Sequence, residues 1–386
     1  MINDIIPFNK LGVAGNELIY MEKAVKSGQI AGDGLYTKKA QSILEKQLLV
    51  SGRVLLTTSC THALEMAAIL LDIEAGDEVI IPAYTFVSSA LAFVMHNAIP
   101  IFADIRSDTL NIDETKIESL ITLKTRAIVV VHYAGVACEM DAIMEIANKN
   151  NLVVIEDNAH GLYGRYKGQF LGTIGQLATQ SFHESKNISC GEGGALVIND
   201  SQYLERAEII REKGTNRTDF FRGVVDKYTW VDKGSSYVIS DILAAFLTAQ
   251  LLNAETFQKQ RKDIWNRYYS EFEFWASDND IFLPFVPEEC EQSYHMFFLL
   301  MPSLAIRSKF IRYLKSNNII AVFHYLPLDD SKMGQKFLEQ QRDDCNVSRD
   351  MAGRIVRLPF FYALTQEEQE YIIEKIMDFD VRKIYD

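Results

Sequence analysis

The segment SFHESKNISCGEGG (181–194) places one lysine, Lys186, between an aromatic and polar run and a glycine-rich turn. A lysine amine can form a Schiff base with a carbonyl group and can move a proton as a general base. Most lysines are solvated surface charges, so this segment alone assigns no role. The GEGG turn permits close approach to a ligand, but it lacks the GxxxxGK[ST] order of a phosphate loop, and the chain has no GxGxxG pattern.

An acidic residue, Asp157, ends the apolar run NLVVIED (151–157). A carboxylate after a buried strand needs a cationic or hydrogen-bonding partner, because unpaired burial is costly. Two partners suit it equally: the protonated ring nitrogen of a cofactor, or an arginine of the protein. His160 follows three residues later and lies on the same side if a helical turn begins there.

Two further segments supply groups that suit a phosphate or a planar ring. In TTSCTHAL (57–64), the amides of Cys60 and Thr61 and the Thr61 hydroxyl open a predicted helix, whose N-terminus attracts anions. An ordinary helix cap has the same pattern. In PAYTFVSS (82–89), Phe86 follows a predicted strand, where it can stack on a ring or pack in the core.

Together these residues indicate a chemistry that none indicates alone. Pyridoxal 5′-phosphate (PLP) requires a lysine, an acid that keeps its pyridine nitrogen protonated, an aromatic side chain over the ring and a phosphate cup. The protonated ring is an electron sink when the α-proton of a substrate leaves, and the displaced lysine can move that proton. We therefore expect Asp157 and Lys186 at opposite edges of one PLP ring, with no metal ion.

Short β-branched runs alternate with helical patterns from residue 53 onward. Strands are expected at 53–58, 76–82, 99–104, 125–133, 151–157, 173–183 and 194–200, with helices at 61–73, 87–97 and 139–150. Apolar strands separated by helices are typical of a mostly parallel sheet covered on both faces. The fold class is therefore α/β, with about seven strands in a mixed sheet. Ligands of such sheets bind outside the carboxyl ends of the strands.

The C-terminal part of the chain has another pattern. A long helical segment is expected from about 240 to 273, followed by YHMFFLLM (294–301), a helix at 304–316 and NIIAVFHYL (318–326). These segments predict a smaller α+β domain. We expect a large PLP-binding domain at 1–275 and a small C-terminal domain at 276–386.

Charge and cysteine content limit the classes of partner. The net charge of −13 argues against nucleic acid, although a local cluster of donors can still bind one small anion. The five cysteines are scattered with no CxxC pair. This pattern is typical of a reducing cytoplasm and not of a disulfide framework or a zinc site.

One stretch, residues 79–103, contains no Asp, Glu, Lys or Arg. A membrane span needs about 20 mostly apolar residues. Prolines and polar residues interrupt this stretch, so we expect a buried strand, helix and strand instead. The opening MINDIIPFNK has no basic segment followed by an apolar run, so we expect no signal peptide and a soluble, cytoplasmic protein.

At these residues the sequence resembles the DegT/StrS family of nucleotide-sugar aminotransferases, which share the aspartate aminotransferase fold (PLP fold type I). The resemblance covers nearly the whole chain. It rests on the combination of GDGLYTKK (32–39), PAYTFVSS, VHYAG (131–135), IEDNAHG (155–161), SFHESKN, GEGG, HYLPL (324–328) and LPFFYALT (358–365). The stretches 55–82, 131–141, 181–187 and 211–230 resemble a narrower group of the family that acts on dTDP-4-keto-6-deoxyglucose.

The resemblance implies transfer of an amino group from L-glutamate to C4 of dTDP-4-keto-6-deoxy-D-glucose. The product would be dTDP-4-amino-4,6-dideoxy-D-galactose, for surface polysaccharides such as lipopolysaccharide or enterobacterial common antigen. The resemblance also implies a homodimer whose two active sites are shared between the subunits, with the segment around GSSYVIS (234–240) reaching the partner's cofactor.

Single residues receive roles from the same resemblance. Lys186 would carry the cofactor, Asp157 would meet its ring nitrogen, Phe86 would stack on the ring and His160 would lie near its phenolic oxygen. The remaining positions are implied to bind phosphate or substrate: Cys60, Thr61, Ser181 and Ser236 for phosphate, and His183, His324 and Tyr325 for substrate. His183 has packing as an equal alternative.

Two positions depart from the family pattern. Ser236-Tyr237-Val238 stands where many relatives have an NxR-type motif, which puts the phosphate contact across the dimer in doubt. Asp329 replaces the last histidine of HYxPLH. That change either alters sugar contacts or is neutral at a surface turn.

Other activities on the same fold remain as alternatives. A C3 aminotransferase, or a C4 enzyme giving the gluco epimer, would keep this chemistry and change the substrate or the product. Some PLP-dependent sugar dehydratases carry histidine at the lysine position, so Lys186 argues against that class. A non-catalytic homologue would be expected to lose Asp157, Lys186 or Phe86, and all three are present.

Overall fold

Seven strands form the central sheet of the computed structural model, which describes residues 4–382. Their spatial order is β1-β9-β8-β5-β4-β2-β3, and every strand is parallel to the others except β9, which is antiparallel to β1 and β8. The strands are β1 (Arg53–Thr57), β2 (Glu78–Pro82), β3 (Ile99–Ala103), β4 (Thr125–Val131), β5 (Val153–Asp157), β8 (Leu177–Ser181) and β9 (Gly194–Ile198). The predicted mixed, mostly parallel sheet of seven strands is confirmed.

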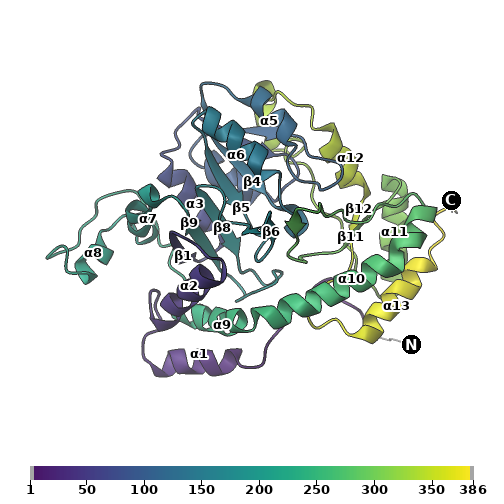
Figure 1. Cartoon of the computed structure of the whole chain (residues 1–386), viewed down its shortest axis with the longest axis horizontal. Helices are drawn as coiled ribbons and strands as arrows, with labels where there is room; N and C mark the ends of the chain where they lie inside the picture. Colours follow the sequence, from purple (N-terminus) through teal and green to yellow (C-terminus); the bar gives the residue numbers. More distant parts are fainter. Residues whose placement is uncertain (1–3, 383–386) are drawn as a thin grey trace.

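Helices cover both faces of this sheet (Figure 1). The helices of residues 17–252 are α1 (Glu17–Lys26), α2 (Leu35–Gln47), α3 (Cys60–Leu70), α4 (Ser88–Val94), α5 (Glu114–Leu120), α6 (Met140–Lys149), α7 (Leu204–Arg211), α8 (Arg217–Phe221) and α9 (Asp241–Leu252), of which α8 extends away from the sheet. Successive strand residues enter opposite cores: Ile155 packs in the cluster that contains α3, whereas Val154 packs in the cluster that contains α6. Burial on both faces explains why the strands read as continuous apolar runs.

The charge-free stretch 79–103 forms β2, α4 and β3, as its prolines and polar residues predict. Among residues 4–382, none of the helices is long and apolar enough to cross a membrane. All five cysteines are free thiols.

The C-terminal part has its own core around the long helix α10 (Ala254–Asp278). Aromatic and aliphatic side chains of α10 pack with those of the last helix and with Ile6 near the N-terminus. The other elements of this part are β10 (Cys290–Glu291), β11 (Phe298–Leu300), α11 (Leu304–Ser316), α12 (Asn346–Arg354), β12 (Ile355–Arg357) and α13 (Gln366–Met377). A small sheet pairs β11 with β12, and β10 joins the short hairpin β6 (Arg165–Tyr166) and β7 (Gln169–Phe170).

The helical segment expected over about 240–273 is formed by two consecutive helices. Asn253 separates α9 from α10, with φ −111° and ψ 14°, and its side-chain amide donates to the carbonyl of Ala249. Asparagine competes for backbone hydrogen bonds in this way and so interrupts helices. Because α10 continues to Asp278, the expected boundary at 275/276 falls inside a helix, and the domain division stays a prediction.

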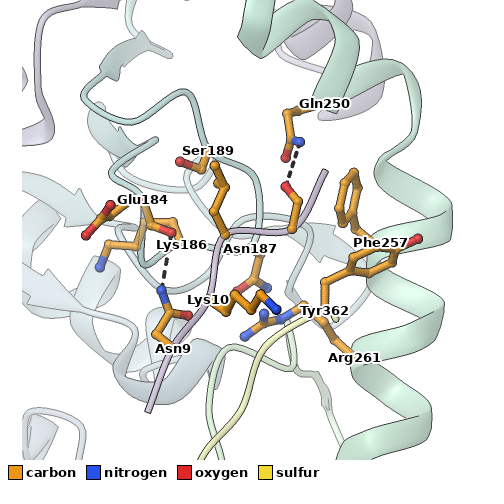
Figure 2. A pocket seen from close by; sticks show the side chains of 12 residues that line it. Asn9, Lys10, Glu184, Lys186, Asn187, Ser189, Gln250, Phe257, Arg261 and Tyr362 are labelled. Carbon is orange, nitrogen blue, oxygen red and sulfur yellow. Dashed lines mark hydrogen bonds between the residues drawn. The ribbon is translucent and has the colours of Figure 1, made fainter. Parts of the chain in front are cut away.

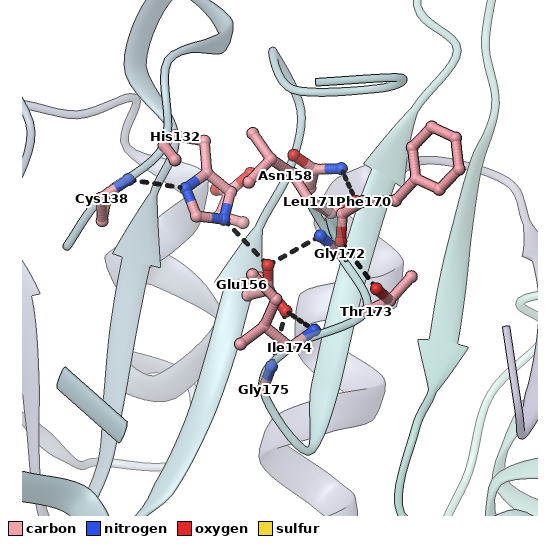
Figure 3. Close-up of polar contacts among 12 residues, drawn as sticks. His132, Cys138, Glu156, Asn158, Phe170, Leu171, Gly172, Thr173, Ile174 and Gly175 are labelled. Atoms are coloured by element: carbon pink, nitrogen blue, oxygen red, sulfur yellow. Dashed lines mark hydrogen bonds and ion pairs between the residues drawn. The ribbon is translucent and has the colours of Figure 1, made fainter. Parts of the chain in front are cut away.

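A buried carboxylate ties β5 to the turn that precedes β8 (Figure 3). Glu156 is fully buried, and its two oxygens accept hydrogen bonds from the backbone N–H groups of Gly172 (2.7 Å), Ile174 (2.7 Å) and Gly175 (2.6 Å). His132 Nε2 lies 2.9 Å from Glu156 Oε2. A buried carboxylate this well supplied with donors is stably held.

The tautomer of His132 follows from its second contact. The backbone N–H of Cys138 donates to His132 Nδ1 at 3.2 Å, so Nδ1 is an acceptor and Nε2 carries the proton given to Glu156. Neighbouring strand residues point to opposite faces, so holding Glu156 on one face fixes the direction of Asp157 on the other. This hydrogen-bond network of Glu156 and His132 was absent from the sequence predictions.

Candidate active site

The predicted PLP residues meet outside the carboxyl end of the sheet. Asp157 is the last residue of β5, Ser181 is the last residue of β8, and Cys60 opens α3 just beyond β1. Lys186 lies on the loop that leads from β8 to β9. The parallel strands therefore deliver these groups to one edge, as expected for an open α/β sheet.

Asp157 is buried and bonded only to neutral donors. The Ser89 hydroxyl donates to Asp157 Oδ2 at 2.7 Å, the Ala159 N–H donates to Oδ1 at 3.2 Å, and Cys60 Sγ lies 4.0 Å from Oδ1. Within residues 4–382 no arginine pairs with it, so the arginine alternative is wrong. Burial raises the pKa of Asp157, while the hydrogen bond from Ser89 opposes the shift. A cation bound beside this carboxylate would offset the free-energy cost of burying its charge.

Lys186 is held near the tip of a closed loop. The antiparallel ladder of β8 and β9 continues past the strands through Phe182, whose N–H donates to Gly193 and whose carbonyl accepts from Cys190. The Lys186 N–H donates to the carbonyl of His183 at 2.9 Å. The backbone of the lysine is thus fixed by its own loop.

The Lys186 amine has neither an ion pair nor a hydrogen bond in the described part of the chain. Burial lowers its pKa from 10.5 to about 8, against smaller upward effects of Cys60 and Asp157. Near neutral pH an appreciable fraction of this amine is therefore unprotonated and nucleophilic. An ordinary surface lysine has no such property.

His160 lies in a stack of rings above the same edge. Its ring is parallel to that of His295, with centroids 4.2 Å apart, and it meets the edge of Tyr133 at 5.8 Å. Burial, followed by the charges of Lys186 and Arg357, holds the pKa of His160 well below its usual range, so the ring is neutral. Its Nδ1 is buried without a hydrogen-bond partner among residues 4–382, which leaves one polar atom available to a ligand.

A second loop residue fixes His295. Asn187 donates through its side-chain nitrogen to the carbonyl of Ser293 (2.7 Å), so its oxygen accepts from His295 Nδ1 (2.9 Å). The residue that follows Lys186 therefore positions the ring on which His160 stacks.

The start of α3 has the backbone arrangement that the predicted phosphate cup requires. Ser59 caps the helix by accepting from the His62 N–H, and the N–H groups of Cys60 and Thr61 find no acceptor in the described residues. The Thr61 hydroxyl lies 2.8 Å from that of Ser88. Free N–H groups at a helix N-terminus favour an anion.

Gly194 explains why the GEGG turn ends in glycine. A Cβ on this residue would lie 2.3 Å from Cys60 N, so only glycine allows β9 to pass the start of α3 this closely. Gly194 also pairs with Ser181 in the sheet, which places Ser181 next to the cup.

Aromatic residues form the outer rim. The Tyr133 hydroxyl lies 3.1 Å from His324 Nδ1, and the Tyr84 hydroxyl donates to the carbonyl of His324. The Tyr325 ring contacts those of Tyr84 (5.8 Å) and Phe86 (6.1 Å). The structure thus brings His324 and Tyr325 to the same site as His160 and Phe86.

Phe86 is 54% exposed, unlike the buried rings of Tyr84 and Tyr133. Its stacking role and the other assigned roles stay predictions, as does that of Ser236, which is exposed and forms one strand bridge to Glu212. His183 is partly exposed and bonds within its own loop, where Nδ1 lies 2.9 Å from the Ser185 hydroxyl.

Asp329 is not at a neutral surface turn. It is 3% exposed and pairs with Arg349 of α12, so the departure from HYxPLH creates a structural ion pair.

A pocket borders the other side of the Lys186 loop, where Asn9 Nδ2 donates to the Glu184 carbonyl at 3.5 Å (Figure 2). The N-terminal segment therefore supports this loop from outside.

The family model for DegT/DnrJ/EryC1/StrS aminotransferases matches residues 13–377. The chain belongs to this family. It is 30% identical to GDP-perosamine synthase of Escherichia coli O157:H7 over 97% of this chain and 98% of that one. It is 33% identical to a dTDP-3-amino-3,6-dideoxy-alpha-D-galactopyranose transaminase of Aneurinibacillus thermoaerophilus, over 79% of each chain.

A solved structure supports the same assignment. The PMP form of a putative sugar aminotransferase, Spr1654 of Streptococcus pneumoniae, matches with a TM-score of 0.88 and 27% identity over 97% of each chain. The protein is therefore a PLP-dependent sugar aminotransferase with the expected fold.

The residues of this chain suit PLP. Three groups of the site lack a complementary partner among residues 4–382. They are the Nδ1 atom of His160, the amine of Lys186 and the carboxylate of Asp157, whose pKa is raised. When bound, PLP supplies an electron sink for a substrate carbanion. Asp157 would hold a proton at the ring nitrogen, and Lys186 would attach the cofactor and move the substrate proton.

The sequence predictions missed several residues of the site. Ser89 and Thr179 contact Asp157 and Cys60, and Asn187 and His295 order the rings. Ser89 lies in the charge-free stretch 79–103, which is predicted to be buried. A hydroxyl in such a stretch needs a hydrogen-bond partner, and this need could have pointed to Ser89. His295 has no signal, because its partner lies 108 positions away.

The lowered pKa of Lys186 predicts an unusual pH profile of reactivity. Cofactor-free protein is methylated with formaldehyde and cyanoborohydride between pH 6 and 11, and each lysine is followed by mass spectrometry. The rate at Lys186 should level off above about pH 8, whereas the rate at free Nα-acetyl-lysine, used as an ordinary solvated lysine amine, should rise beyond about pH 10. Parallel profiles would contradict the assigned environment.

Replacing the acid by its amide separates catalysis from folding. Asp157→Asn keeps the shape that Ser89 and Ala159 contact but cannot hold the ring proton by charge, so turnover should fall about 100-fold or more. Removal of a buried charge should leave the melting temperature unchanged or raise it. Unchanged turnover, or loss of activity explained by unfolding, would contradict this role.

Proposed function

We propose that the enzyme transfers the amino group of L-glutamate to C4 of dTDP-4-keto-6-deoxy-D-glucose, giving dTDP-4-amino-4,6-dideoxy-D-galactose for surface polysaccharide. The observation that carries the proposal is the pair formed by the free, pKa-lowered Lys186 and the buried Asp157 at one sheet edge. The narrower sequence resemblance supplies the sugar and its configuration.

The rim supports a sugar ligand. Exposed Phe86 and the neighbouring Tyr325 offer apolar ring faces, while His324 and Tyr133 offer polar atoms for hydroxyl groups. This mixture of a few placed polar groups among aromatic side chains suits a small polar ligand that must be oriented. Lys186 lies inside this rim and can transfer a proton at the carbon that receives the amine.

We propose a homodimer with shared sites. Figure 1 shows α8 and its flanking segments extending away from the sheet, and this arm carries the exposed side chains Phe221, Val224 and Trp230. Helix α1 also exposes Leu18 and Ile19. Apolar groups gathered on protruding elements favour burial against another chain. The five free cysteines suit a reducing cytoplasm.

A C3 aminotransferase is the second candidate, favoured by the similarity to a dTDP-3-amino-sugar transaminase. Product analysis separates the two. The enzyme is incubated with L-[15N]glutamate and either the 4-keto or the 3-keto dTDP-6-deoxy sugar, and the product is examined by NMR. We expect 15N at C4 and the small H3–H4 coupling of the galacto configuration.

Other products give clear contrary results. A large H3–H4 coupling would assign the gluco epimer, and 15N at C3 would assign the second candidate. A sugar lacking an oxygen and carrying no 15N would indicate the dehydratase class.

The variant Lys186→Ala should abolish turnover. Lys116→Ala, at an exposed lysine of α5, is its matched control.

A further inference from the structure

Two hydroxyl groups lead from the start of α4 to the carboxylate of Asp157. Thr85 Oγ1 lies 2.9 Å from Ser89 Oγ, and the Ser89 hydroxyl donates to Asp157 Oδ2 at 2.7 Å. The N–H of Ser89 donates to the carbonyl of Phe86, so a tight turn carries the chain from Thr85 into α4. Thr85, Ser89 and Asp157 are all buried. The segment that exposes Phe86 at the rim therefore also brings two hydroxyls to the acid.

The direction of these hydrogen bonds follows from the number of protons available. A hydroxyl has one proton to donate, and Ser89 gives its proton to the carboxylate. Ser89 Oγ is therefore the acceptor in its contact with Thr85, and the Thr85 hydroxyl is the donor. The chain of hydrogen bonds runs from Thr85 through Ser89 to Asp157. Each bond strengthens the next, because hydrogen bonds in series polarise one another.

The two oxygens of Asp157 are held unequally. Oδ2 accepts the 2.7 Å bond from Ser89. Oδ1 accepts the longer bond from the Ala159 N–H (3.2 Å) and lies 4.0 Å from Cys60 Sγ, which is also 3.3 Å from Thr179 Oγ1. A thiol is a weak donor, so Oδ1 is the less satisfied oxygen and has room for one more donor. It is the atom suited to the N–H of a cofactor ring.

Ser89 does more than the other groups to favour the charged form of Asp157. Burial raises the pKa of Asp157, and the hydrogen bond from Ser89 opposes this rise more than Ala159, Lys186 or His132 does. A donor to a carboxylate disperses its negative charge and lowers its affinity for a proton. In a hydrogen bond between a ring nitrogen and Oδ1, the two atoms compete for one proton. The bond from Ser89 favours the nitrogen in that competition.

We propose that the hydroxyls of Thr85 and Ser89 keep the proton on the ring nitrogen of PLP by making Asp157 the weaker base. Both are positioning residues, because they act through the acid. The neighbouring Ser88 lies 2.8 Å from the Thr61 hydroxyl at the predicted phosphate cup, so successive serines of α4 serve the two parts of the site. The proposal rests on the role proposed for Asp157 and not on the identity of the sugar.

Another serine of this chain provides a matched control. Ser348 is buried and donates to Oδ1 of the buried Asp104 at 2.7 Å, the same length as the bond from Ser89 to Asp157. Asp104 follows β3, and strands β2 and β4 separate β3 from β5 in the sheet. Ser89→Ala and Ser348→Ala each remove one bond from a hydroxyl to a carboxylate, so both should lower the melting temperature. Only Ser89→Ala should change the properties of the site.

The first test needs no cofactor. Protein labelled with [4-13C]aspartate is titrated by NMR, and the Asp157 signal is identified by its absence in Asp157→Asn. In Ser89→Ala the midpoint should move up by about one pH unit, because the carboxylate loses a charge-assisted hydrogen bond. Thr85→Val should move the midpoint less, and Thr85→Ser, which keeps the hydroxyl, should retain the wild-type value. Ser348→Ala should leave the midpoint unchanged.

The second test locates the proton in the holoenzyme. The protein is loaded with PLP that carries 15N in the ring, and the 15N NMR signal is recorded. Wild type and Ser348→Ala should give the shift of a protonated pyridine, whereas in Ser89→Ala the signal should move toward that of an unprotonated one. The reaction with L-glutamate alone, followed by loss of the visible band, should slow about tenfold or more in Ser89→Ala.

The outcomes separate this proposal from the proposed function. An unchanged Asp157 midpoint or an unchanged ring-nitrogen signal in Ser89→Ala would overturn it and leave Ser89 a structural role only. If Ser89→Ala does not fold, Thr85→Val is measured instead and should move both signals in the same direction. Full turnover in Asp157→Asn would remove the role of the acid and this proposal with it. If wild type aminates no keto sugar, the proposed function fails, while both NMR measurements still test Ser89.

Discussion

The fully buried carboxylate of Glu156 is the contact on which the geometry of the site depends. Three backbone N–H groups of the turn before β8 and the Nε2–H of His132 hold it on one face of β5. Strand alternation then directs Asp157 to the other face. The same contact fixes the start of β8, whose far end leads to the Lys186 loop. The hydrogen bonds of Glu156 thus help to position both Asp157 and the loop that carries Lys186.

The site around them is left electrically incomplete. Among residues 4–382, Asp157 has a raised pKa and no ion pair, Lys186 has a lowered pKa and no ion pair, and His160 keeps a buried nitrogen without a hydrogen-bond partner. Each of these unpaired groups lowers the stability of the protein without ligand, and a ligand with a complementary group would remove that loss. Cofactor binding should therefore stabilise the chain while it assembles the reactive centre.

Much of this arrangement was predictable from the sequence, because apolar strands and the rule about their carboxyl ends are local signals. These signals predicted that Asp157 ends a buried strand and that Lys186 lies on a loop between two strands. The order of the strands in the sheet was not predicted, because it depends on contacts between distant segments. The break at Asn253 was not predictable from periodicity, since apolar spacing continues across it. Contacts such as Asn187 with His295 and the ion pair of Asp329 depend on distant chain segments, and no local pattern encodes them.

The absorbance spectrum of the PLP-loaded protein tests the central claim most directly. The visible band of the lysine-bound cofactor should disappear when L-glutamate is added and return when dTDP-4-keto-6-deoxyglucose follows. The Lys186→Ala variant should lack this cycle. A wild-type protein that stays colourless with PLP, or whose band L-glutamate leaves unchanged, would contradict the account.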